Sequence, residues 1–265
     1  MAADLDLEAY LARIGHPGPL APDLATLRAL HAAHVASIPF ENLDVQMGLP
    51  IRLDLASLQG KLVRRRRGGY CFEQNTLFQA VLKRVGFDLM SCEARVRRGA
   101  TTLLARTHML LLARLEGRPW LCDVGFGADG PLEPVPLDGA IHRQPQGTFR
   151  VVAEAEGERL NVLQSLQDDA WTDLYAFRAE ARFPVDYEMA NHFTSTHPES
   201  RFVKTLTAQR QDAQGRRILR NRAYAEIRGE AVEGRELAPE EVIPVLREVF
   251  GLDVPEGASF RAFGG

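Results

Sequence analysis

The spacing of apolar residues changes along this 265-residue chain, and that change limits the fold more than any other feature. In the first third, apolar residues recur at helical spacing, as in the stripe Leu77, Phe78, Val81, Leu82 and Val85. This spacing predicts helices over residues 5–14, 23–37, 55–66 and 71–85. Turn-forming Gly and Pro residues separate most of these segments. The first third is therefore predicted to be a helical bundle.

The rest of the chain changes to short apolar runs between Gly, Pro and Asp clusters. In the middle third, these runs predict antiparallel strands over residues 110–115, 120–124 and 149–153. An irregular or helical connector is predicted over residues 184–197. Beyond it we expect strands over 201–209, 216–219 and 223–227, and then a helix over 239–250. The pattern indicates an α+β fold with a helical bundle, a β-rich middle and a smaller α/β end.

The composition excludes several classes of partner. The 32 Lys and Arg residues nearly balance 35 Asp and Glu, which leaves a net charge of -3 and gives no reason to expect a nucleic-acid partner. Three cysteines without paired spacing predict neither a metal site nor disulfides, and they fit a reducing cytoplasm. The first residues are acidic, and the longest apolar stretch, at 109–113, is too short to span a bilayer. We expect a soluble cytoplasmic protein without a membrane partner.

A cysteine at the start of the fourth predicted helix is the best candidate for a nucleophile. Cys71 follows two glycines, which permit a sharp turn that exposes the next side chains. The first turn of a helix offers free N–H groups and a positive dipole end, and both stabilise a thiolate. The alternative is that Cys71 packs as a small apolar residue. Cys92 and Cys122 lack a helix-start context and are predicted to be structural. At least three of the four arginines at 64–67 are predicted to face solvent.

A histidine and a carboxylate on one predicted hairpin are candidates for the base and its orienting group. His108 opens an apolar strand, and the return strand carries Asp123. If residues 116–117 form a two-residue turn, the two side chains are diagonal neighbours on one face, about 7–8 Å apart at the backbone. A three-residue turn would put them on opposite faces. His31 and His34 lie on a predicted helix and are interpreted as ordinary helix residues, and the other histidines fall in turns, loops or the connector.

A glycine pattern at residues 125–130 (GFGADG) matches the dinucleotide-binding fingerprint. That fingerprint requires a helix directly afterwards, whose N-terminus receives the pyrophosphate. Prolines at 131, 134 and 136 prevent such a helix. The pattern therefore predicts no dinucleotide site, and it indicates a loop whose backbone can approach a ligand closely.

Four segments occur in the order of the signature segments of a known family. They are residues 39–43 (PFENL), 67–75 (RGGYCFEQN), 107–109 (THM) and 123–127 (DVGFG). A fifth and weaker match consists of Asn191 followed by residues 195–202. Together they resemble the arylamine N-acetyltransferases over most of the chain from 39 to 202.

The resemblance implies a three-part fold: a helical bundle over 1–86 with the nucleophile, an antiparallel β-barrel over 87–183 with the histidine and aspartate, and an α/β lid over 201–265. Residues 184–200 would connect the last two parts. The first two parts would be related to the papain and transglutaminase cores. The implied reaction moves an acetyl group from acetyl-CoA to the nitrogen of an arylamine, arylhydrazine or arylhydroxylamine by a ping-pong route, and it implies a role in xenobiotic metabolism.

The resemblance also assigns residues to roles. The family's catalytic triad corresponds to Cys71, His108 and Asp123. Acetyl-CoA is a co-substrate, so no cofactor is permanently bound and no metal is needed. The pocket for the acceptor and for CoA would include Phe40, Val96, Thr107, Gly125, Phe126 and Phe202. Beyond residue 202 no lid residue can be matched to a CoA contact, and the oligomeric state is not predicted.

The same triad permits other functions. A cysteine hydrolase or a transglutaminase would work without CoA on an extended peptide. An amide synthase of the same family would close a macrolactam from a carrier-bound polyketide. A binding module would keep the fold without turnover, which an intact triad argues against. Spacing alone does not separate acyl transfer from hydrolysis, so that choice depends on the resemblance.

Overall fold

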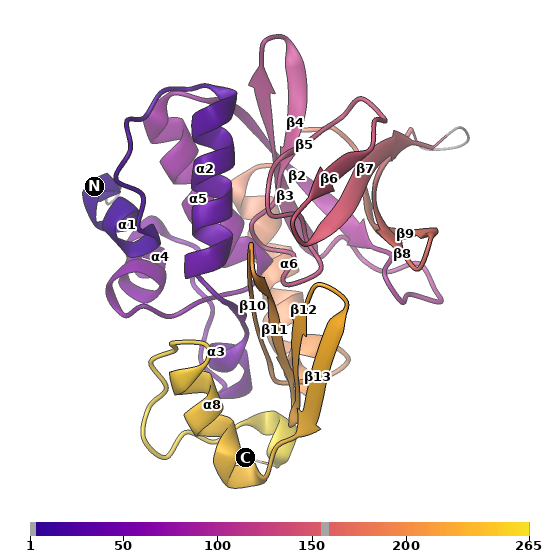
Figure 1. Cartoon of the computed structure of the whole chain (residues 1–265). Coiled ribbons are helices and arrows are strands. Elements are labelled where there is room, and N and C mark those ends of the chain that lie inside the picture. Colours follow the sequence, from indigo (N-terminus) through magenta and orange to yellow (C-terminus); the bar gives the residue numbers. More distant parts are fainter. Residues whose placement is uncertain (1–3, 155–158, 265) are drawn as a thin grey trace.

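The computed structural model describes residues 4–154 and 159–264, and its first third is helical (Figure 1). Asp23 starts α2 by accepting the backbone N–H of Thr26, and Gly86 ends α5 in the left-handed conformation. The helices are α1 (Leu7–Ile14), α2 (Leu24–Ser37), α3 (Leu43–Gln46), α4 (Leu55–Leu58), which continues as a π-helix (Gln59–Arg64), and α5 (Cys71–Val85). The predicted helical bundle is confirmed.

The middle of the chain forms an eight-stranded antiparallel sheet that curls into a nearly closed barrel, in which β5 lies near β7. In order of hydrogen bonding its strands run β5-β4-β3-β2-β9-β8-β7-β6. Their bounds are β2 (Asp88–Val96), β3 (His108–Leu115), β4 (Arg118–Cys122), β5 (Val135–Pro136), β6 (His142–Gln144), β7 (Gly147–Ala153), β8 (Asn161–Gln167) and β9 (Ala170–Phe177). The antiparallel strands predicted from the short apolar runs are confirmed.

The last third forms a smaller sheet with helices packed against it, below the helices and the barrel in Figure 1. The sheet has the order β1-β10-β11-β12-β13, with β1 (Phe40–Glu41), β10 (Thr207–Asp212), β11 (Gly215–Arg220), β12 (Ala223–Arg228) and β13 (Ala231–Glu236). The helix predicted over 239–250 is a 3-10 turn (Pro239–Glu241) followed by α8 (Val242–Glu248), and a second 3-10 turn lies at Arg261–Phe263. Strand β1 belongs to the N-terminal third of the sequence, so it ties the first part of the chain to the last.

The predicted strand over 201–209 is wrong in its first half. Pro184–Thr196 forms helix α6, and a second short helix, α7 (Arg201–Lys204), follows directly. Ser200 starts α7 because its Oγ accepts the N–H of Phe202 at 3.3 Å. Asn42 Nδ2 then donates to the carbonyls of Phe202 and Thr205, each at 2.8 Å. These long-range bonds fix a helical turn where the local pattern favoured a strand.

Strand β3 is apolar along most of its length because both of its faces are buried. Met109 and Leu111 pack in the hydrophobic core shared with the helices, whereas Leu110 and Leu112 pack inside the barrel. Side chains alternate along a strand, so His108 shares the barrel-facing side with Leu110. A further apolar core lies in the C-terminal part, around Leu246 and Phe250. The domain boundaries at 86, 183 and 200 stay a prediction.

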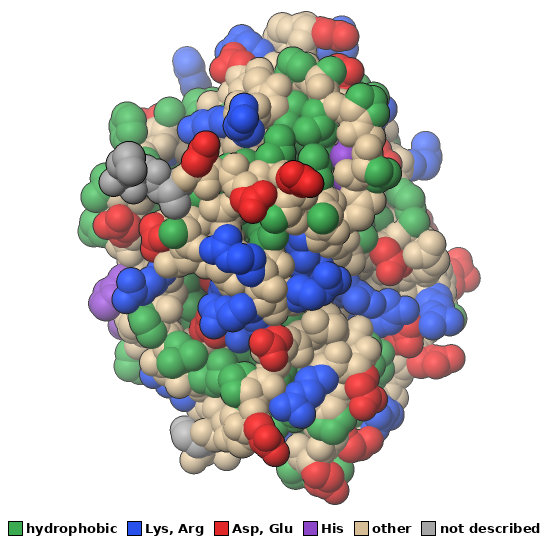
Figure 2. Space-filling view, turned by 90° about the vertical axis from the view of Figure 1, so that its left-hand side faces the viewer, with side chains coloured by type: hydrophobic (Ala, Val, Ile, Leu, Met, Phe, Trp, Pro, Cys, Tyr) green, Lys and Arg blue, Asp and Glu red, His purple; other side chains and the backbone are tan. Residues whose placement is uncertain are grey.

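Figure 2 shows a band of Lys and Arg side chains across the middle of the face that carries α1. Arg13 of α1 is buried and is repelled by the charges of Arg66 and Arg210. Burial and these two neighbours together lower the pKa of Arg13 to about 10. Among the helices of the described ranges, none is both long enough and apolar enough to cross a membrane.

Candidate active site

Cys71 is the first residue of α5, as the sequence predicts. The turn before it is tight, because a Cβ at Gly68 would lie 2.0 Å from the carbonyl oxygen of Pro39. Glu73 accepts the N–H of Tyr70 at 3.1 Å and so holds the start of the helix. The Cys71 side chain is 4% exposed, and its Sγ lies 3.6 Å from the carbonyl oxygen of Thr107. The thiol therefore lies at a helix start within a nearly closed site.

The β3–β4 hairpin has the two-residue turn on which the pairing of His108 and Asp123 depends. Leu115 pairs with Arg118, and the intervening Glu116 and Gly117 have φ angles of 50° and 74°. Two positive φ angles in succession define the type I′ turn that matches the twist of a hairpin. This register brings the two candidate side chains to one face, with His108 Nε2 2.6 Å from Asp123 Oδ2.

Electrostatics in this pair favour a charged imidazole beside a charged carboxylate. Burial works against a charge on His108, but the charge and hydrogen bond of Asp123, with a further contribution from Cys71, raise the pKa of His108 to about 10. Burial also opposes ionisation of Asp123, but His108 and further hydrogen bonds hold the pKa of its carboxyl below the usual range. Because Nε2 faces Asp123, Nδ1 is the ring nitrogen left for the thiol.

Three residues hold Asp123 in place, and sequence reasoning did not assign this role to any of them. Asn75 Nδ2 donates to Asp123 Oδ1 at 2.9 Å, and the N–H of Gly125 donates to the same oxygen at 2.9 Å. The N–H of Asp123 donates to His31 Nε2 at 3.1 Å, and burial lowers the pKa of His31 to about 4, so that nitrogen stays an acceptor. Asn75 follows Cys71 by four residues on the same helix face, a spacing that could have identified it. His31 carried no such signal.

Of the six residues expected to form the pocket, three contact Cys71 or His108 directly, and the other three are linked to them through neighbouring residues. The ring of Phe126 packs edge-on against His108, with centroids 5.2 Å apart. A Cβ at Gly125 would lie 2.7 Å from the Cα of Cys71. Phe202 contacts both Tyr70 and Phe40, with centroids 5.5 and 5.9 Å apart. Val96 is further removed: it pairs across the strands with Tyr175, whose ring packs on His108. Thr107 contributes the carbonyl described above.

An open pocket of about 380 Å³ begins beside Thr107. One wall comes from the segment before β3 and the other from α6. Its lining residues are Glu93, Ala105, Arg106, Thr107, Arg182, Asp186, Met189, Ala190 and Phe193. Of the six expected pocket residues it shares Thr107 alone. The pocket thus reaches Thr107, and Cys71 is not among its lining residues.

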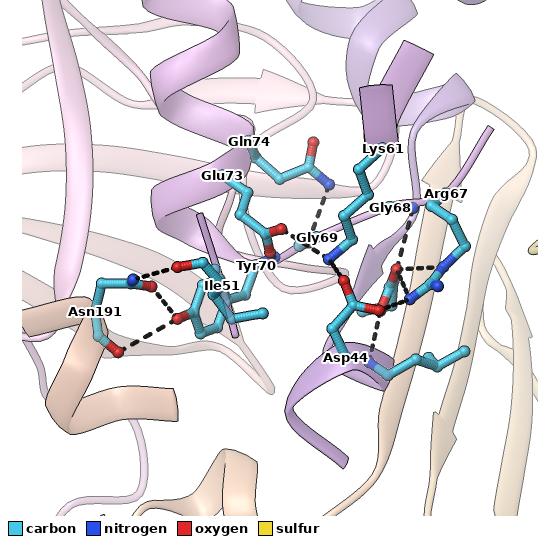
Figure 3. Close-up of polar contacts among 12 residues, drawn as sticks. Asp44, Ile51, Lys61, Arg67, Gly68, Gly69, Tyr70, Glu73, Gln74 and Asn191 are labelled. Atoms are coloured by element: carbon cyan, nitrogen blue, oxygen red, sulfur yellow. Dashed lines mark hydrogen bonds and ion pairs between the residues drawn. The ribbon is translucent and has the colours of Figure 1, made fainter. Parts of the chain in front are cut away.

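A buried group of charges supports the turn before Cys71 (Figure 3). Lys61 Nζ lies 2.7 Å from both Asp44 and Glu73, and Arg67 pairs with Asp44 and with Glu41 at 2.9 and 2.8 Å. This result fits the prediction for the arginine run, since residues 64–66 are exposed and Arg67 is buried. The carboxylates satisfy backbone N–H groups as well, so the network fixes the approach to the nucleophile.

The same close-up shows how α6 meets this turn. Tyr70 OH contacts the side chain of Asn191, and Asn191 Nδ2 donates to the carbonyl of Ile51 at 3.0 Å (Figure 3). Asn191 belongs to the weakest of the five sequence matches. Its contacts join α6 to the residue that precedes Cys71.

The remaining sequence features behave as expected. Cys92 and Cys122 are fully buried, and burial raises the pKa of both thiols, that of Cys92 to about 12. Residues 125–134 form bends and turns with no helix among them, as the prolines require. The glycine pattern thus forms a loop that lies against the start of α5. Because no helix follows it, the structure also excludes a dinucleotide-binding site of this type.

A thiol, an imidazole and a carboxylate in this order are the groups used by enzymes with a cysteine nucleophile. The model of the N-acetyltransferase family matches residues 23–259. Arylamine N-acetyltransferases of Escherichia coli and Mycolicibacterium smegmatis are 38% and 37% identical to the chain, each over 94% of it and over 90% and 93% of their own lengths. The chain belongs to the arylamine N-acetyltransferase family and is an acyltransferase.

Solved structures agree with the fold. The arylamine N-acetyltransferase of Mycobacterium abscessus superimposes with a TM-score of 0.90 at 38% identity, covering 95% of this chain and 91% of that one. The enzyme of Mycobacterium marinum in complex with CoA gives a TM-score of 0.87 at 37% identity, covering 93% of both chains. The predicted α+β architecture of bundle, barrel and C-terminal α/β part is confirmed.

Proposed function

We propose that this protein carries an acetyl group from acetyl-CoA to the nitrogen of an arylamine, arylhydrazine or arylhydroxylamine, through a thioester on Cys71. The observation that carries the proposal is the 2.6 Å contact of His108 Nε2 with Asp123 Oδ2, formed in a buried site beside a thiol at a helix start. Further support comes from the names of its relatives and from the CoA bound to the M. marinum enzyme. The presence of three free cysteines fits a reducing cytoplasm.

In the first half of the reaction, His108 takes the proton of the Cys71 thiol, and Asp123 stabilises the resulting imidazolium. The thiolate attacks the acetyl carbonyl carbon, and a bond forms between Cys71 Sγ and that carbon. The N–H groups in the first turn of α5 stabilise the negative oxygen. The carbon–sulfur bond to CoA then breaks, and the CoA thiolate leaves with the proton from His108.

In the second half, the amine nitrogen attacks the Cys71 thioester, and His108 removes the proton that the nitrogen must lose. The carbon–sulfur bond to Cys71 breaks, and the thiol recovers its proton. Phe126 lies against the imidazole and gives the aromatic ring of the acceptor an apolar surface, with Phe40 and Phe202 nearby. The pocket beside Thr107 opens next to the residue whose carbonyl contacts the thiol.

A panel of acyl donors and aromatic amines tests the proposal. With acetyl-CoA we expect CoA release that depends on the acceptor, fastest with a simple aromatic amine or hydrazine. Cleavage or crosslinking of peptides without CoA would instead make the protein a hydrolase or a transglutaminase. Reaction of a carrier-bound polyketide acyl group, with no reaction of acetyl-CoA, would make it an amide synthase. Absence of turnover with every donor would leave a binding module.

A further inference from the structure

Three arginines converge on one carboxylate at the end of the glycine loop, and a fourth arginine lies close to them. Arg98 and Asp129 form an ion pair, and Arg216 and Arg220 lie 3.8 and 3.6 Å from the same aspartate. Arg201 is close enough to Arg98 and Arg220 to repel both. The reaction steps above use none of these side chains. With all groups ionised, the four cations exceed the charge of Asp129 by three.

The cluster is assembled from distant parts of the sequence. Arg98 lies in the turn after β2, Arg201 is the first residue of α7, and Arg216 and Arg220 stand four residues apart on β11, so they project from the same face of the strand. The fold therefore brings residues of the barrel, of α7 and of the C-terminal sheet close together. Such convergence is costly for like charges, since each arginine raises the energy of the others.

The charges in the cluster are poorly compensated. Burial and repulsion by Arg220, Arg216 and Arg201 lower the pKa of Arg98, and burial with repulsion by Arg220 lowers the pKa of Arg201. Within the described part of the chain, the buried Nε of Arg216 has no hydrogen-bond partner. The side chains of Arg98, Arg216 and Arg220 are nevertheless 32%, 25% and 45% exposed, so an anion can reach them. One carboxylate is therefore shared among three guanidinium groups, which leaves the positive charge of the cluster in excess.

The cluster is held rigidly at a fixed place relative to the thiol. Gln209 Oε1 accepts the N–H of Ala128 at 2.9 Å, and Gln211 Nε2 donates to the carbonyls of Gly127 and Gly130 at 3.2 and 3.0 Å. These bonds fix the loop that presents Asp129. At its other end the loop begins at Gly125, directly against Cys71. The four residue steps from Gly125 to Asp129 span at most about 14 Å. The loop therefore sets an upper limit of this size on the backbone distance between its end at the start of α5 and its end at the arginines.

We propose that Arg98, Arg201, Arg216 and Arg220 bind the phosphate groups at the nucleotide end of CoA. This inference rests on the proposed function. CoA has its thiol at one end and its phosphates at the other, joined by a flexible arm, which matches a thiol site and a cationic site at opposite ends of one loop. Guanidinium groups bind phosphate through paired hydrogen bonds, and several of them around one point suit a ligand with more than one phosphate. Asp129 keeps the arginines together while no phosphate is bound.

The kinetic test compares two donors that share a thioester and differ in phosphates: acetyl-CoA and S-acetylpantetheine. For Arg216→Gln and Arg220→Gln we expect the KM for acetyl-CoA to rise about 10- to 100-fold, the range expected for a lost charged hydrogen bond. The KM for S-acetylpantetheine should stay within about twofold. Arg222→Gln is the matched control, since Arg222 is 41% exposed and pairs with Glu236 instead. Equal changes with both donors, or none with either, would overturn the proposal.

A binding measurement separates this inference from the proposed function. Titration calorimetry with adenosine 3′,5′-bisphosphate should give binding to the wild type that weakens in high salt and in Arg220→Gln, and adenosine should bind far more weakly. If the bisphosphate binds in this way but neither donor acetylates the protein, the phosphate site stands and the proposed function fails. If both donors acetylate the protein and the bisphosphate binds every variant alike, the function stands and the phosphate site fails.

Discussion

Gly125 lies against the nucleophile so closely that a Cβ on it would stand 2.7 Å from the Cα of Cys71 and 2.8 Å from Asn75 Nδ2. Its backbone N–H also donates to Asp123, so this one residue touches the thiol's helix and the carboxylate together. The close approach between the loop and the start of α5 therefore leaves no room for a side chain at position 125.

We expect Gly125→Ala to disturb both contacts. Overpacking of this kind costs about 1–3 kcal/mol of unfolding free energy, and turnover should fall more than about tenfold because the thiol and carboxylate must shift. Urea unfolding and steady-state acetylation measure the two effects. Gly234→Ala is the control, because its nearest neighbour, the carbonyl oxygen of Tyr224, lies at 3.6 Å. Full activity in Gly125→Ala would contradict the packing described here.

Asp123→Asn should leave the fold intact and remove most of the turnover. An amide at this position can no longer stabilise the imidazolium, and it favours the wrong tautomer of His108. We expect a loss of about 10³- to 10⁴-fold in kcat. Asp138→Asn provides a matched control, because Asp138 lies 3.5 Å from His142 in a His–Asp pair far more exposed to solvent. A fully active Asp123→Asn variant would mean that another group orients the imidazole.

The hairpin that carries His108 and Asp123 was predictable because local rules decide it. A two-residue turn at 116–117 sets the register, and the register sets which side chains share a face. The helix start at Cys71 was predictable for the same reason, since two glycines and an apolar stripe mark it.

The parts that sequence reasoning missed depend on contacts between distant segments. Strand β1 was not predicted because its pairing partner β10 lies more than 160 residues later. Helix α7 replaced a predicted strand because Asn42 binds its carbonyl groups. The support of Asp123 by His31 joins residues 92 positions apart. Periodicity indicates which face of a helix or strand is buried, but it does not identify the segment that packs against that face.

The buried carboxyl of Glu73 predicts an unusual pH dependence of stability. Burial, together with the charges of Glu41 and Asp44, raises its pKa to about 7 against the attraction of Lys61. The unfolded value is about 4.3, so the stability from this group is fully present below that pH and is lost as the pH rises through 7. Between pH 5.5 and 7.5 we expect the wild type to lose about 1–3 kcal/mol more unfolding free energy than Glu73→Gln. Urea unfolding at both pH values measures the difference, and equal losses would contradict the assignment.

The three thiols should differ sharply in reactivity. Cys92 and Cys122 are fully buried with raised pKa values, so they stay protonated near neutral pH. Cys71 lies beside an imidazole that can take its proton. At pH 7 iodoacetamide should label Cys71 more than about tenfold faster than the other two, as followed by peptide mass spectrometry. Asp123→Asn should slow the labelling of Cys71 and leave the others unchanged. Equal rates at all three cysteines would favour an inert binding module.

The intact mass of the protein after exposure to acetyl-CoA, without any amine, tests the central claim most directly. If Cys71 carries the acetyl group, the wild type gains the mass of an acetyl group, and the gain disappears on addition of an aromatic amine. Cys92→Ala and Cys122→Ala should behave like the wild type, and Cys71→Ala should keep its original mass. Acetylation that persists in Cys71→Ala would contradict the account.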